Sequence, residues 1–133
     1  MKKGRRAAVR AAGTSYGLPA AVAAILAGYG VYTNVSPYTL ESSIQIRATP
    51  QQVWAVLADT AELRWIGRVG PGGIFDGEHT FTITQIRPGV VLFTQREDFT
   101  GVAVPFYEHW LHTDTLPMFG AMNAALAHRV TGG

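Results

Sequence analysis

A long run without any charged side chain, from Ala11 to Leu40, limits how this chain can fold more than any other feature. Residues 18–32 within it are apolar throughout, and a helix that crosses a bilayer needs about 20 mostly apolar residues. Residues 1–10 hold five of the eleven basic residues of the chain. This basic flank predicts a membrane-spanning signal anchor, with the rest of the chain outside the cytoplasm.

Two other interpretations of this segment are open. A cleavable signal peptide would be processed at the small-x-small sequence Gly28-Tyr29-Gly30, and the domain would then be secreted. The third interpretation is an amphipathic or buried core helix, which the absence of a polar face disfavours. The chain divides into a basic and apolar leader, a linker and a domain, at residues 1–33, 34–39 and 40–133.

Composition narrows the partners of that domain. Residues 11–133 carry six arginines against nine acidic side chains, and therefore a net charge of −3. Binding to nucleic-acid phosphates depends on a surplus of Lys and Arg, so we expect no nucleic-acid partner. Without cysteine the chain forms no disulfide and no thiolate metal site, and we expect no cofactor and no bound metal.

Apolar periodicity predicts an α+β fold for the domain. A short helix follows the hydroxyl N-cap at Thr49, and a long helix runs over residues 105–130 with a break at Pro117. We expect this long helix to pack on an antiparallel sheet of about four strands. The apolar face of the helix consists of Phe119, Met122, Leu126 and Val130. Alternation predicts the strands over residues 41–48, 62–69, 78–86 and 90–99.

Three stretches of the domain resemble, in the same order, segments of the START/Bet v 1-like (SRPBCC) superfamily, in its polyketide cyclase/lipid-transport-like group. Residues 42–59 resemble the first strand and helix, and residues 62–81 resemble a pair of later strands. Residues 95–106 and 118–129 resemble the last strand and the C-terminal helix. The resemblance implies a helix-grip fold, in which a curved sheet and the C-terminal helix enclose a hydrophobic cavity.

The chain also departs from this family. The family has a second short helix and several strands between its first helix and the strand that residues 62–69 resemble. Here Asp59 is followed almost at once by Glu62, so the domain is a shortened version. With about four strands left, we expect an open groove in place of a closed cavity, or a sheet that a second copy completes through its exposed edge.

The resemblance implies that the domain binds a small hydrophobic molecule, such as a lipid or a polyketide-like compound. One alternative is an aromatase/cyclase- or dehydratase-type enzyme that uses His79 as acid or base, although we favour binding over catalysis. Another alternative is a protein-interaction module or truncated relic that pairs through its sheet edge. The expected ligand-binding residues are Trp65, His79, Phe81, Ile83, Phe93, Gln95, Glu97, Phe99, Phe119 and Met122.

His79 and Glu97 are the polar end of this set. If residues 87–89 form a three-residue loop, His79 lies opposite Glu97 on the apolar face of the sheet. A two-residue loop would place His79 opposite Asp98 instead. An imidazole oriented by a carboxylate can act as a general base. We favour a buried pair that fixes the strand register.

The start of the C-terminal helix carries further candidates. His109, His112 and Asp114 form an H-x-x-H-x-D pattern, and two histidines at i and i+3 can hold a metal with a third ligand. We favour a solvated helix face for them. Tyr107 and Trp110 beside them either rest on a membrane surface, line the entrance of a groove or pack in the core, and their spacing favours core packing.

Overall fold

The computed structural model describes residues 17–57 and 64–132, with Arg64 and Trp65 represented by their backbone. The beginning of the strand expected over 62–69 therefore lies outside the described residues. The elements are α1 (Gly17–Val35), β1 (Tyr38–Ile46), α2 (Pro50–Leu57), β2 (Arg64–Val69), β3 (Phe75–Arg87), β4 (Val90–Thr100), α3 (Val104–Trp110), a π-helical turn (Leu111–Thr115) and α4 (Leu116–Thr131).

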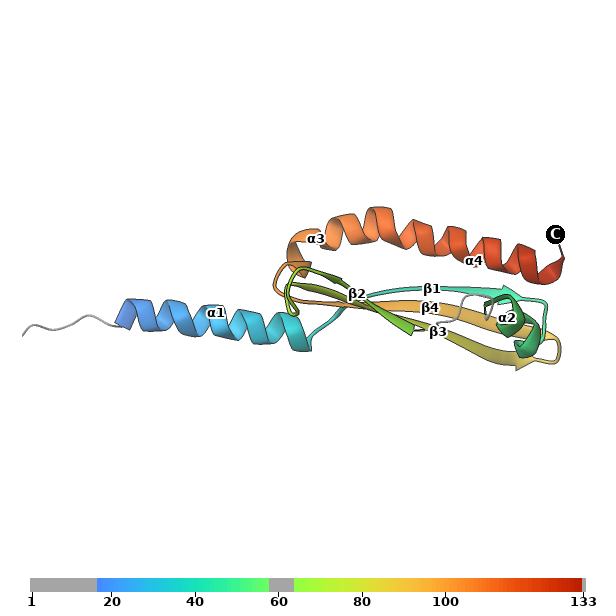
Figure 1. Cartoon of the computed structure of the whole chain (residues 1–133), viewed down its shortest axis with the longest axis horizontal. Coiled ribbons are helices and arrows are strands. Elements are labelled where there is room, and N and C mark those ends of the chain that lie inside the picture. Colours follow the sequence, from blue (N-terminus) through green and yellow to red (C-terminus); the bar gives the residue numbers. More distant parts are fainter. Residues whose placement is uncertain (1–16, 58–63, 133) are drawn as a thin grey trace, which may run out of the picture.

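The fold is of the expected α+β class. The strands form one antiparallel sheet in the order β1-β4-β3-β2. The long helix α4 lies along one face of this sheet, and α2 lies beside it at the end away from α1 (Figure 1). The opposite face carries polar side chains, among them Ser43 and Thr94, whose hydroxyl oxygens are 2.8 Å apart.

The first helix of the domain begins as the sequence predicts. The N–H of Gln52 donates to the hydroxyl of Thr49 at 3.3 Å, and the N–H of Thr49 donates to the Gln52 side chain at 2.8 Å. This reciprocal pair is a capping box, which satisfies two backbone donors that the helix leaves open. α2 then buries Val53 and Leu57 against the sheet and α4.

The β3–β4 hairpin has the expected register but not the expected loop. Arg87 pairs with Val90, so the loop has two residues, Pro88 and Gly89, and Gly89 has a φ of +71°. The prediction of a three-residue loop is therefore wrong. A bulge between Gln85 and Arg87 takes up the extra residue and restores the alignment. The pairs His79–Glu97, Phe81–Gln95 and Ile83–Phe93 follow.

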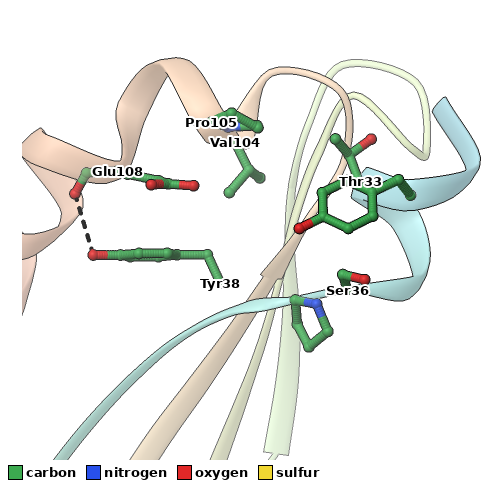
Figure 2. A pocket seen from close by; sticks show the side chains of 8 residues that line it. Thr33, Ser36, Tyr38, Val104, Pro105 and Glu108 are labelled. Atoms are coloured by element: carbon green, nitrogen blue, oxygen red, sulfur yellow. Dashed lines mark hydrogen bonds between the residues drawn. The ribbon is translucent and has the colours of Figure 1, made fainter. Parts of the chain in front are cut away.

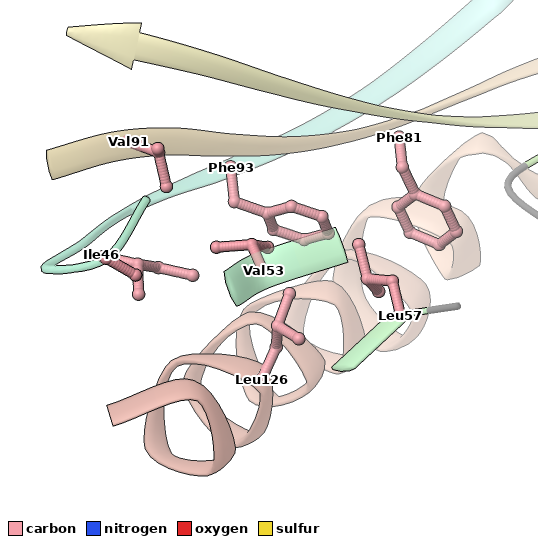
Figure 3. Packing of buried hydrophobic residues seen from close by; sticks show 8 residues of the cluster. Ile46, Val53, Leu57, Phe81, Val91, Phe93 and Leu126 are labelled. Atoms are coloured by element: carbon pink, nitrogen blue, oxygen red, sulfur yellow. The ribbon is translucent and has the colours of Figure 1, made fainter. Parts of the chain in front are cut away.

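The core lies between the sheet and α4 and has two apolar parts with a polar layer between them. The first part lies at the α2 end (Figure 3) and consists of Ile46, Ala48, Val53, Leu57, Phe81, Val91, Phe93 and Leu126. The second part lies toward α3 and consists of Leu40, Phe99, Val104, Leu111 and Phe119. The buried side chains of the polar layer are His79, Gln95 and Asn123.

The C-terminal helix changes its winding just before Pro117, where a break is expected. In the π-helical turn the N–H of Leu116 donates to the carbonyl of Leu111, and Pro117 lies in the first turn of α4. A π turn takes up one residue more than an α turn. Leu111 and Phe119, eight positions apart, therefore face the same side, and both are buried in the second part of the core.

The helix α1 leads away from the sheet along the long axis of the molecule (Figure 1), and Thr33 is its one buried residue. In the described part of the chain it is the one helix long and apolar enough to cross a membrane, a test that a signal sequence also passes. The helix continues to Val35 and β1 begins at Tyr38, so the connection is shorter than the linker expected over 34–39. The carbonyl of Thr33 accepts the N–H of Gly101 at 2.9 Å and ties α1 to the domain.

Candidate functional site

A chain of hydrogen bonds runs through the polar layer. Nε2 of His79 lies 3.0 Å from the side-chain oxygen of Gln95. The amide nitrogen of Gln95 donates to the carbonyl of Phe119 at 2.8 Å and to the side-chain oxygen of Asn123 at 2.7 Å. Asn123 in turn donates to the hydroxyl of Ser42 at 3.1 Å. The chain therefore connects β3, β4, α4 and β1.

These bonds determine where His79 carries a proton. The Phe119 carbonyl can only accept, so Gln95 directs its NH₂ group there and its oxygen toward Nε2 of His79, which must then be protonated. Nδ1 of His79 lies 3.4 Å from a carboxylate oxygen of Glu97. This contact is attractive when a proton lies on either group. Gly77 leaves room for that carboxylate, because a Cβ there would lie 2.5 Å from the other Glu97 oxygen.

The central side chains of the polar layer are closed to solvent. His79 is 5% exposed, and Gln95 is fully buried. In the described part of the chain, every buried side-chain nitrogen and oxygen has a hydrogen-bond partner. A fully satisfied polar group inside a core specifies how the surrounding elements pack, whereas a ligand site directs polar groups toward the ligand. The arrangement favours a structural role, which is to hold α4 in one position on the sheet.

The aromatic residues expected to bind a ligand contact one another. The rings of Phe81 and Phe93 stack at 5.6 Å, and the ring of His79 lies 5.0 Å from that of Phe119. Phe93 is fully buried, and Phe99 belongs to the second part of the core. These residues therefore form the interior of the helix–sheet interface.

The other expected ligand-binding residues lie at the margins of the helix–sheet interface or outside the described residues. Ile83 is partly buried against the first part of the core. Trp65 pairs with His79 through the backbone of β2, and its side chain lies outside the described part of the chain. The prediction that Met122 lies on the sheet-facing side of the C-terminal helix is wrong, because Met122 is 39% exposed and Asn123 takes the buried position.

Sequence reasoning missed two members of the polar layer. Asn123 and Ser42 were not among the predicted site residues. The signal was present for Asn123, which follows Phe119 by four positions and precedes Leu126 by three. Those spacings place it on the buried stripe of a helix.

Large apolar side chains are exposed at the end of the domain where α1 joins it. The end face, as we call this surface, consists of Val69, Ile74, Phe106, Tyr107 and Trp110. Phe106 is 80% exposed, Trp110 is 52% exposed and Tyr107 is 50% exposed. The prediction that Tyr107 and Trp110 pack in the core is therefore wrong. Figure 1 shows α3 at this end of the sheet, next to the point where α1 leaves.

A groove opens in the end face between α3 and the turn that joins β2 to β3. Its volume is about 330 Å³, and the ring of Phe75, which lines it, lies 5.7 Å from the rings of both Tyr107 and Phe99. The lining side chains are aliphatic or aromatic, so the groove suits an apolar ligand. They are Val69, Ile74, Phe75, Ala103, Tyr107 and Trp110.

Hydrogen bonds hold the rim of the groove. The N–H of Ala103 donates to the carbonyl of Ile74 at 2.9 Å. Asp76 closes the turn, since it accepts from the N–H of Gly73 at 2.7 Å and from Nε of Arg68 at 2.6 Å. The backbone hydrogen bond from Gly73, and then the bond from Arg68, lower the pKa of Asp76 below its usual value of 3.8. Hydrogen bonds within the chain therefore hold the rim.

A second hollow, the junction pocket, lies where α1, β1 and α3 meet (Figure 2). Its volume is about 210 Å³, and its lining mixes hydroxyl groups with the carboxylate of Glu108. The hydroxyl of Tyr38 donates to the carbonyl of Glu108 at 3.5 Å. The mixed lining suits an apolar ligand less well than the groove does. The lining residues are Tyr32, Thr33, Ser36, Pro37, Tyr38, Val104, Pro105 and Glu108.

The H-x-x-H-x-D pattern lies on the surface. His109, His112 and Asp114 are all exposed, and Asp114 accepts the hydroxyl of its neighbour Thr113 at 2.7 Å. Across residues 17–57 and 64–132, no three side chains of the metal-binding types come together in a way that would hold an ion. The candidate site is therefore the groove.

Comparison with known proteins adds no relative. No family model, no curated protein and no solved structure matches this chain. The functional argument therefore depends on the residues and geometry of the chain itself, and the likeness to the START/Bet v 1-like superfamily stays an expectation.

Proposed function

We propose that this chain is a single-pass membrane protein whose domain, a shortened helix-grip fold of the START/Bet v 1-like (SRPBCC) kind, binds a small hydrophobic molecule in the groove of the end face. The apolar lining of the groove carries this proposal. Ligand pockets are mostly apolar and begin at volumes of about 300 Å³. The groove therefore suits part of a lipid chain or a small ring system.

The length and surface of α1 support the membrane anchor. Its 19 residues rise about 28 Å at 1.5 Å per residue, close to the hydrocarbon thickness of about 30 Å. Leu18, Ile25 and Leu26 are 77%, 69% and 65% exposed, and such an apolar surface is stable in lipid rather than in water. Together with the basic residues before it, α1 favours a domain outside the cytoplasm.

The contacts of α1 favour its retention over its cleavage. A cut at Gly28-Tyr29-Gly30 separates or frays the turn whose Tyr29 hydroxyl donates to the carbonyl of Val102 at 2.8 Å. It also leaves Thr33, the buried residue of α1, one turn from a free chain end. A secreted form would therefore lose contacts that the anchored form keeps.

In this proposal the helix–sheet interior is structural. His79 is 5% exposed, and its two ring nitrogens face Gln95 and Glu97. A general base needs its substrate within hydrogen-bond distance. These observations favour ligand binding over the cyclase or dehydratase alternative.

The anchor also bears on the alternative of pairing through a sheet edge. The strands run along the long axis of the molecule, and α1 continues in that direction (Figure 1). Antiparallel pairing of two β1 edges reverses that axis, so the two α1 helices would leave from opposite ends. One membrane does not accept both helices, and a homodimer of this kind is therefore favoured only for a chain without α1.

Photolabelling tests the groove. Full-length protein in detergent micelles is irradiated with a diazirine-bearing fatty acid, and the labelled peptides are mapped by mass spectrometry. We expect the label in residues 69–75 and 103–110. Ala103→Phe fills the groove and should lower this labelling several-fold. Equal labelling of Ala103→Phe and the wild type would contradict the proposal.

A matched control uses another apolar hollow, which lies between α2 and α4. Ala125 lines a space of about 180 Å³ between α2 and α4, together with Leu57 and Met122. Ala125→Phe adds the same volume there and should leave labelling of the groove unchanged. A loss in both variants would indicate a general effect on the fold rather than a block of the groove.

A further inference from the structure

We infer that the end face rests in the headgroup layer of the membrane that α1 crosses, so that the groove is filled from the bilayer by the acyl chain of a lipid. This inference rests on the anchor in the proposed function. It follows from three observations: the contacts between α1 and the domain, the length of α1 and the position of its tyrosines, and the chemistry of the end face.

The first observation is that the last turns of α1 lie beside the domain. Tyr29 donates to Val102, and the N–H of Gly101 donates to Thr33. The side chain of Asn34 donates to the carbonyl of Gly73 at 3.5 Å. Tyr29 precedes the end of α1 by six residues, or about 9 Å. The loops at Gly73 and Gly101–Val102 therefore reach back along α1 toward the membrane.

The second observation sets the depth of those turns. α1 rises about 28 Å, close to the hydrocarbon thickness of about 30 Å, so its last turns, which carry Tyr29 and Tyr32, lie near the boundary between hydrocarbon and headgroups. Tyrosine prefers this level. Because Val102 contacts Tyr29, the rim of the groove lies at that level too.

The third observation is the composition of the end face. Trp and Tyr are enriched at membrane interfaces because one part of the ring is apolar and another is polar. The end face combines Tyr107 and Trp110 with the exposed Phe106, Val69 and Ile74. The carboxylate on α3, Glu108, lines the junction pocket instead.

The absence of cysteine allows a direct test on the full-length protein. His109 lies on α3 beside the end face, and His128 lies near the end of α4; both are exposed. His109→Cys and His128→Cys each receive a nitrobenzoxadiazole dye and are reconstituted into phosphatidylcholine vesicles. A fraction of the lipid carries a nitroxide on its headgroup, which quenches the dye at short range.

We expect several-fold stronger quenching at position 109 than at position 128. Replacing Phe106 and Trp110 by serine in the His109→Cys protein should reduce that quenching toward the level at position 128. Equally weak quenching at both positions, in protein that is still in the vesicles, would overturn the inference and leave the anchor intact. Protein that does not enter vesicles would overturn the proposed anchor, and the inference with it.

The lipid as occupant has its own measurement. Vesicles of a lipid brominated in the middle of its acyl chain should quench the fluorescence of Trp110, which lines the groove. The test uses a protein whose other tryptophans, Trp54 and Trp65, are replaced by phenylalanine. Ala103→Phe in that protein should reduce this quenching and keep the headgroup quenching at position 109. Unchanged bromine quenching would show that no acyl chain occupies the groove.

Discussion

The helix–sheet interior and the end face differ in where their polar and apolar side chains lie. In the interior, polar side chains are buried and hydrogen-bonded to one another, whereas at the end face large apolar side chains are exposed. A buried polar group is tolerated when it is paired, and an exposed apolar surface is stable when another surface covers it. The comparison indicates that the polar groups of the interior are satisfied within the domain, whereas the apolar side chains of the end face need another surface to cover them.

The largest effect should come from the centre of the polar layer. Gln95→Leu removes three hydrogen bonds at once, those to His79, to Asn123 and to the Phe119 carbonyl, from buried polar groups. We expect the free energy of unfolding to fall by about 3–5 kcal/mol. Urea unfolding of the full-length protein in mild detergent measures this.

Gln85→Leu is the matched control, because Gln85 is exposed on β3. It should change the free energy of unfolding by about 0.5 kcal/mol or less. If Gln95→Leu and Gln85→Leu have similar effects, the polar layer does not hold the interior together, and its residues become candidates for function again.

The second largest effect should come from the loop that supports the end face. Gly101 has a φ of +120°, and a Cβ there would overlap the carbonyl group of Ile74. Gly101→Ala should therefore destabilise the protein by about 2–4 kcal/mol. It should also disturb the hydrogen bond to Thr33 and lower photolabelling of the groove.

Gly120→Ala provides the contrast for this variant. Nothing lies within 4 Å of a Cβ at Gly120, which is exposed on α4. Alanine favours a helix over glycine, so Gly120→Ala should stabilise the protein by up to about 1 kcal/mol. A similar loss in both variants would show that neither loop geometry nor close approach explains Gly101.

The two regions also differ in how far the sequence predicts them. The strands and the His79–Glu97 pair follow from local alternation. The predicted register is correct although the predicted loop length is wrong, because the bulge near Ile86 adds one residue where the loop has one fewer. Local spacing places Asn123 on the buried stripe of α4, but it does not identify its partner Gln95, which lies 28 positions away on another element. A local pattern cannot show that a polar residue has a distant partner.

The end face is harder still to predict. Its residues come from the end of β2, from the turn after it and from α3. Backbone hydrogen bonds from Val102 to Gly73 and from Ala103 to Ile74 bring these segments together. Aromatic residues at helical spacing predict core packing for Tyr107 and Trp110, and the pattern carries no information about which helix face a distant sheet covers. The exposure of the end face therefore becomes visible only in three dimensions.

A smaller effect should appear in acid. The lowered pKa of Asp76 means that its ionised form stabilises the folded state above pH of about 4. This contribution is lost as the pH falls through the folded pKa. Burial raises the pKa of Asp98, but hydrogen bonds from Arg96 and Thr39 outweigh it and lower the pKa, so Asp98 adds a loss in the same range.

Asp76→Asn tests how much of this loss of stability in acid comes from the carboxylate of Asp76 at the groove rim. The variant should lose less stability between pH 6 and pH 3 than the wild type, because it has no carboxylate to protonate at that site. Urea unfolding at the two pH values measures the difference. Asp114→Asn on the π-helical turn is the control. If Asp76→Asn loses as much stability between pH 6 and pH 3 as the wild type does, Asp76 does not contribute to the pH dependence.

The smallest effect should come from Pro117, which lies where the two regions meet. In a helix interior, replacing proline with alanine stabilises the helix by about 3 kcal/mol. Here Pro117 lies in the first turn of α4, where its missing N–H matters less, and the π-helical turn before it keeps Leu111 and Phe119 on one buried face. An uninterrupted α-helix would rotate Leu111 away from Phe119. Pro117→Ala should therefore keep the π turn and change the free energy of unfolding by less than about 1 kcal/mol, as urea unfolding would show. A gain near 3 kcal/mol would mean that the proline alone imposes the turn and that the core next to the end face repacks without it.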